Sequence, residues 1–129
     1  MRLNRGFTLA AAVLGALVVS SVALAAGGVA GTYKATIQNS GHLNGKWVLV
    51  LTKGGTYTVS MNGHALARGR YAATAKTITF DRETGSSCSG AGVYAWEKAG
   101  KTITFIRKRE SASCRARGAV LARRFTQVR

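Results

Sequence analysis

One five-residue stretch occurs twice in the second half of the chain. Lys-Thr-Ile-Thr-Phe fills positions 76–80 and again positions 101–105. Both copies alternate Thr with Ile or Phe, the period-two pattern of a strand with one face in solvent. Each copy is followed by an arginine, a glutamate, a serine and a cysteine. The repeat predicts a fold built from β-hairpins.

Eight segments after residue 30 have the composition of strands, and we expect no helix among them. Short turns join several of them, including Asn62-Gly63, a pair suited to a tight hairpin. The chain has no proline that would interrupt a ladder. The fold class expected is therefore all-β, an eight-stranded antiparallel up-and-down barrel. The predicted strands are 31–37, 45–52, 56–62, 65–73, 76–83, 92–98, 101–109 and 118–128.

The N-terminal residues have the organisation of a signal peptide. Arg2 and Arg5 precede an apolar run over 7–24, and Ala23-Leu24-Ala25 is a small-x-small cleavage site. We expect a signal helix over 1–25, a barrel domain over 26–129 and a secreted or periplasmic protein. An uncleaved membrane anchor remains the alternative, because the run approaches the roughly 20 residues that span a bilayer.

The two cysteines, Cys88 and Cys114, are expected to form a disulfide in an exported protein. Connections in an up-and-down barrel alternate between its two ends. The long ones, 38–44, 84–91 and 110–117, therefore lie together and bring the cysteines to one end of the barrel. That end is the predicted mouth.

The chain resembles the lipocalin-like, or calycin, group of small bacterial β-barrels. The resemblance rests on Gly31-Thr32-Tyr33 at the entry, Trp47 in the next strand, and Arg123 and Arg124 near the end. It implies a barrel in which an aromatic side chain packs under an arginine from the last strand. Because the chain is short, the interior would be filled or would hold one small ligand.

One face of each strand must point into the barrel, and its large residues are candidates for ligand binding. Such a lining suits a small apolar or amphipathic ligand, although the same side chains would also serve as a core. Arg107 lies two residues after Phe105 and is therefore expected on the same, inward face of its strand. Arg124 lies in the last predicted strand. Either arginine would bind the head group of an anionic ligand. The ligand-binding candidates are Trp47, Tyr57, Tyr71, Phe80, Tyr94, Trp96, Phe105, Arg107 and Arg124.

The charge balance supports a second hypothesis. Nineteen Lys and Arg stand against four acids, and the pI is about 11.2. A basic exported protein is attracted to anionic envelope polymers or to a membrane surface, whereas no aromatic stacking platform for nucleic acid is evident. A basic surface without a partner is the alternative. A secreted hydrolase inhibitor that uses Arg115 or Arg117 in a mouth loop is a third hypothesis.

Catalysis has little support in the sequence. The segment 85–90 contains serines and Cys88 but lacks the Gly-x-Ser-x-Gly nucleophile motif. His42 and His64 match no metal-ligand spacing. We therefore expect a non-enzymatic protein with no cofactor and no metal. Val48 and Val50 would form an outward apolar stripe, which fits a homodimer or a covering N-terminal segment.

Overall fold

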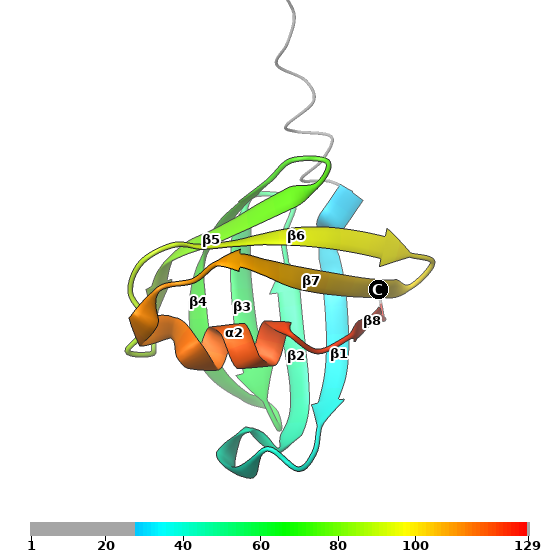
Figure 1. Cartoon of the computed structure of the whole chain (residues 1–129). Coiled ribbons are helices and arrows are strands. Elements are labelled where there is room, and N and C mark those ends of the chain that lie inside the picture. Colours follow the sequence, from blue (N-terminus) through cyan, green and yellow to red (C-terminus); the bar gives the residue numbers. More distant parts are fainter. Residues whose placement is uncertain (1–27, 129) are drawn as a thin grey trace, which may run out of the picture.

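The computed structural model describes residues 28–128 and shows a closed barrel of eight antiparallel strands (Figure 1). Each strand pairs with the next along the chain, and β8 pairs with β1. The fold class is confirmed, whereas the predicted signal peptide lies outside the described residues. Within 28–128 there is no helix with the length and apolar character to cross a membrane. The strands are β1 (Gly31–Ile37), β2 (Gly45–Leu51), β3 (Thr56–Met61), β4 (His64–Ala73), β5 (Thr77–Thr84), β6 (Gly92–Ala99), β7 (Thr102–Arg109) and β8 (Phe125–Gln127).

The last predicted strand and the expected absence of helix are wrong. Residues 115–121 form the helix α2 (Arg115–Leu121), which follows a 3-10 turn, η2 (Ala112–Cys114), and only Phe125–Gln127 is extended. Val120 and Leu121 are buried against the barrel core. Apolar spacing over seven residues fits a short helix as well as a strand, so packing against the barrel decides between them.

Because β8 is short, α2 covers part of the barrel wall. β8 pairs with Tyr33 and Lys34 of β1 and with Thr102 and Ile103 of β7. Beyond these pairs α2 lies beside β7, as Figure 1 shows in orange. A second 3-10 turn, η1 (Gly41–Leu43), joins β1 to β2.

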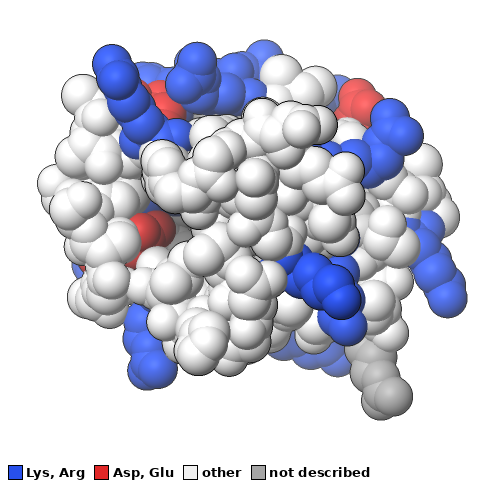
Figure 2. Space-filling view, turned by 90° about the horizontal axis from the view of Figure 1, so that it is seen from below, with Lys and Arg blue, Asp and Glu red and all other residues white. Residues whose placement is uncertain are grey.

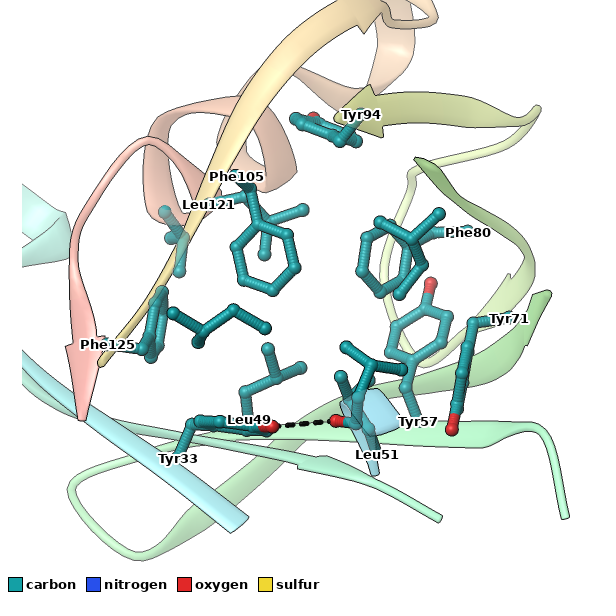
Figure 3. Close-up of a cluster of buried hydrophobic side chains, with 14 of the residues drawn as sticks. Tyr33, Leu49, Leu51, Tyr57, Tyr71, Phe80, Tyr94, Phe105, Leu121 and Phe125 are labelled. Atoms are coloured by element: carbon teal, nitrogen blue, oxygen red, sulfur yellow. Dashed lines mark hydrogen bonds between the residues drawn. The ribbon is translucent and has the colours of Figure 1, made fainter. Parts of the chain in front are cut away.

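Edge-to-face aromatic rings fill the centre of the barrel (Figure 3). The Phe80 ring lies 5.1 Å from the ring of Tyr57, 5.9 Å from that of Tyr94 and 6.0 Å from that of Phe105. Such pairs contribute about 0.5–1.5 kcal/mol each beyond the burial of their area. Phe125 of β8 extends the series at 6.3 Å from Phe105. The two phenylalanines of the repeat therefore pack on each other.

A β-bulge follows each copy of the repeat. Arg70 of β4 pairs with Asp81 of β5, whereas Arg68 pairs with Thr84, so β5 has one extra residue between these two pairs. Arg82, which lies in this bulge, has a left-handed φ of 54°. In β7 one extra residue, Lys108, separates the residues paired with Tyr94 and Val93. Because one extra residue reverses which face the following side chains occupy, Glu83 and Glu110 turn toward the interior.

Candidate ligand-binding site

A cavity of about 140 Å³ lies inside the barrel at the end that carries the long loops. Its apolar wall includes Trp47, Leu49, Tyr57 and Phe80 from the strands and Val120 and Leu121 from α2. Figure 2 shows a hollow on the face seen from below, with acidic atoms recessed in it and uncharged residues around it. The barrel is thus packed through its centre and hollow toward the predicted mouth.

Helix α2 closes one side of the cavity and carries its basic residue. Arg117 lines the cavity, yet only 6% of its side chain is exposed. Its Nε donates to Glu110 Oε2 at 2.9 Å, and its Nη2 donates to Glu110 Oε1 at 2.6 Å. Nη2 also donates to the Gly90 carbonyl oxygen at 3.0 Å. The two parallel bonds to Glu110 form the bidentate arrangement that guanidinium and carboxylate groups prefer.

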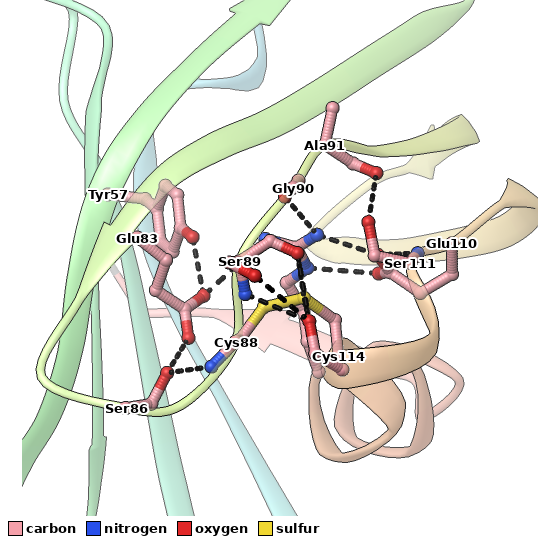
Figure 4. Close-up of a disulfide and its surroundings, with 12 residues drawn as sticks. Tyr57, Glu83, Ser86, Cys88, Ser89, Gly90, Ala91, Glu110, Ser111 and Cys114 are labelled. Atoms are coloured by element: carbon pink, nitrogen blue, oxygen red, sulfur yellow. Dashed lines mark hydrogen bonds and ion pairs between the residues drawn. A yellow bond between two sulfur atoms is a disulfide. The ribbon is translucent and has the colours of Figure 1, made fainter.

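A second glutamate faces the same guanidinium. Glu83 Oε1 lies 3.6 Å from Arg117 Nη1, and the side chain of Glu83 is also 6% exposed. The Tyr57 hydroxyl donates to Glu83 Oε1 at 2.6 Å, and the Ser86 hydroxyl donates to Glu83 Oε2 (Figure 4). We call Glu83, Arg117 and Glu110 the buried triad. With all three groups ionised, it carries a net charge of −1.

The hydrogen bonds to Glu110 keep it ionised despite its burial. Burial alone would raise the pKa of this carboxyl, but hydrogen bonds from Arg117, from Tyr94 and from the Ser111 N–H together hold the pKa below its usual range. The Tyr94 hydroxyl donates to Glu110 Oε2, and burial together with this carboxylate raises the tyrosine pKa. Each glutamate of the triad therefore accepts a bond from one tyrosine of the barrel wall.

The disulfide is confirmed between Cys88 and Cys114, and it lies beside the triad (Figure 4). It links the β5–β6 loop to η2, immediately before the first residue of α2. The Cys88 N–H donates to Ser86 Oγ, the hydroxyl that itself bonds to Glu83. The cross-link thus fixes the start of the helix that carries Arg117 against the loop that follows Glu83.

Gly92 leaves the room that the Glu110 carboxylate occupies. A Cβ atom at this position would lie 2.5 Å from Glu110 Oε2 and 2.6 Å from Oε1. Because the carboxylate is held by Arg117, Tyr94 and Ser111, it has little freedom to withdraw. A glycine at position 92 is therefore part of the geometry of the site.

The predicted ligand-binding residues occupy different parts of the molecule. Trp47, Tyr57 and Phe80 line the cavity. Tyr71, Tyr94 and Phe105 are buried elsewhere in the barrel, and the Tyr71 hydroxyl donates to the Thr52 carbonyl oxygen. Trp96 is half-buried and donates through Nε1 to the Thr74 carbonyl oxygen.

The predicted anion-binding arginines lie at the surface. Arg107 and Arg124 are both exposed, and so is Arg109, two residues after Arg107. Arg107 is paired with the buried Tyr94 and keeps the inward side of β7, but it lies beyond the residues that β8 pairs, so its side chain is exposed. The bulge at Lys108 places Arg109 opposite Val93 instead, on the other face. Arg123 instead donates through Nη2 to Ser40 Oγ at 2.7 Å, which ties the C-terminal segment to the β1–β2 loop.

The triad itself was not predicted, although the sequence contains a trace of it. Glu83 and Glu110 follow the two copies of the repeat at similar distances, in a chain with only four acids. Arg117, which the sequence predicts in a mouth loop as a contact for a hydrolase, is a buried residue of α2. Arg115, the other candidate for that role, is exposed.

No protein-family model, no curated protein and no solved structure matches this chain.

Proposed function

We propose that the protein is an exported, non-catalytic binding module of the lipocalin-like type, which holds a small apolar or amphipathic ligand in the barrel cavity. The observation that carries this proposal is the cavity of about 140 Å³ walled by aromatic and aliphatic side chains. An apolar cavity of about 150 Å³ is large enough to stay dry and bind benzene. The expected ligand, or the part of it that enters the barrel, is about the size of one ring or a short branched chain.

The surroundings of the cavity support binding over catalysis. Glu83 and Arg117, the charged residues of its lining, are held by Tyr57, Ser86 and Glu110. These hydrogen bonds hold both side chains in fixed positions. The disulfide supports export, because disulfides persist in oxidising compartments.

Native mass spectrometry tests the proposal. The protein would be purified from its own host and measured intact, then again after extraction with organic solvent. We expect a defined mass that is lost on extraction. Ala67→Phe, on the cavity wall, should abolish this mass, whereas Ala72→Phe, on an exposed position of the same strand, should retain it. If the protein carries no ligand and takes up no apolar probe such as toluene, the proposal is wrong.

A second candidate function is adhesion to anionic envelope polymer or lipid. Four consecutive residues of β7, Ile106 to Arg109, are exposed, and three of them are basic. At the same time the buried triad removes two of the four acids from the surface. Binding to vesicles that contain anionic lipid should then fall steeply as salt rises. Replacing Arg107, Lys108 and Arg109 by Gln should abolish this binding without changing uptake of toluene.

A further inference from the structure

The polar end of the cavity carries unused hydrogen-bonding capacity. A guanidinium has five N–H donors. In Arg117 the Nε donor and the two Nη2 donors bond to Glu110 and to the Gly90 carbonyl oxygen. The two Nη1 donors have no hydrogen-bond partner among residues 28–128, and Nη1 is buried. A buried donor without a partner is unfavourable, and it is satisfied when a suitable acceptor enters.

The neighbouring acceptor is Glu83. Its Oε1 lies 3.6 Å from Nη1 and accepts one bond, from the Tyr57 hydroxyl. A carboxylate oxygen has two lone pairs, so Oε1 has room for a second donor. A donor and an acceptor position without partners therefore lie side by side, buried at the edge of a mainly apolar cavity whose polar lining residues are Glu83, Arg117, Ser86, Ser87 and Ser113.

The charge of the triad selects among ligands that would use this pair. Two carboxylates and one guanidinium leave a net charge of −1, with all three side chains at least nine-tenths buried. A ligand carboxylate would bring a further negative charge next to Glu83 in a region of low dielectric, where repulsion is strong. An uncharged group that accepts from Nη1 and donates to Glu83 avoids this cost.

We infer that the polar end of the cavity recognises an uncharged carboxamide on a small apolar body. Its carbonyl oxygen accepts from Arg117 Nη1 while its N–H donates to Glu83 Oε1. This inference rests on the proposed function, because it concerns the chemical class of the ligand in the same cavity.

Three probes of nearly equal shape test it. Toluene has no polar group, benzamide has an uncharged amide, and benzoate is an anion at pH 7. Their affinities would be measured by NMR titration of the full chain, expressed for export and purified with its disulfide formed, on the methyl signals of Val120 and Leu121. We expect benzamide to bind at least about tenfold more tightly than either of the others, as one well-placed charge-assisted hydrogen bond allows.

A charge-neutralising variant supplies the second arm. Glu83→Gln keeps an oxygen that accepts from Tyr57 but makes the cluster neutral, so the affinity for benzoate should rise about tenfold while that for toluene stays constant. Glu97→Gln, at an exposed position of β6, is the matched control and should change neither value. The probe series on the unsubstituted protein remains decisive if Glu83→Gln fails to fold.

The outcomes separate the inference from the proposed function. Equal affinities for toluene and benzamide would mean that water satisfies Nη1; the cavity function would stand and the carboxamide inference would fall. Benzoate binding as tightly as benzamide would overturn the charge argument. Failure of all three probes to bind would overturn the inference and the proposed function together.

Discussion

Glu83 and Glu110 follow the two copies of one repeated sequence, and their carboxylates meet at a single guanidinium, that of Arg117. The phenylalanines of the two copies also contact each other, and so do their cysteines. The repeat therefore builds two sides of one interior site. The residue between them, Arg117, belongs to neither copy.

Arg117→Met should be strongly destabilising. It leaves two buried carboxylates without their cation, and removal of one partner of a buried ion pair costs about 3–5 kcal/mol. The measurement is the free energy of unfolding from urea titration. Arg115→Met, two residues away at an exposed position, should change it by less than about 0.5 kcal/mol. Equal small effects for both variants would show that the triad contributes little to stability.

Acid should destabilise the protein through Glu110. Its pKa is lowered in the folded state from a reference of 4.5, so the unfolded state binds protons more readily. The stability that this group provides is present above about pH 4.5 and is lost as the pH falls toward the folded-state pKa. Melting temperatures between pH 7 and pH 3 measure the effect.

The matching variants are Glu110→Gln and Glu97→Gln. Glu110→Gln should lower the melting temperature at pH 7 and flatten its decline in acid, because the group can no longer titrate. Glu97→Gln should leave the decline unchanged. An unaltered slope in Glu110→Gln would rule out Glu110 as the source of the acid sensitivity.

Loss of the disulfide should weaken both the fold and the site. The cross-link spans 26 residues, for which the chain-entropy estimate is about 3 kcal/mol. Urea titration with and without reductant measures this loss, and the double variant Cys88→Ala with Cys114→Ala should not respond to reductant. If reduction leaves the unfolding midpoint in place, the bond does not constrain the unfolded chain as this argument requires.

Gly92→Ala should disturb the triad without touching its charges. The added methyl group would lie within 2.5 Å of the Glu110 carboxylate, and overpacking of this kind costs about 1–3 kcal/mol. Gly54→Ala, whose Cβ would approach no atom closer than 3.9 Å, is the control and should be nearly neutral. The measurement is the urea concentration at the unfolding midpoint of each variant. Equal midpoints for Gly92→Ala and Gly54→Ala would contradict the steric argument.

The sequence allowed seven strands and the disulfide to be predicted, because alternation and loop length are local properties of the chain. It did not allow α2 to be predicted, since seven residues with only two large apolar side chains, Val120 and Leu121, fit either periodicity and packing decides. The inward direction of Glu83 and Glu110 was also out of reach. It depends on bulges at Arg82 and Lys108, and neither residue type is typical of a bulge.

The short pairing of β8 has a consequence for how copies of the protein behave toward one another. On the C-terminal side of Ile103, the residues of β7 do not pair with β8. The unpaired edge of a strand can pair with a strand of a second molecule. Helix α2 lies beside this edge, and Arg107, Lys108 and Arg109 place three positive charges along it. Like charges repel between copies, so we expect the basic run that would attract an anionic surface to oppose edge-to-edge pairing of two barrels as well.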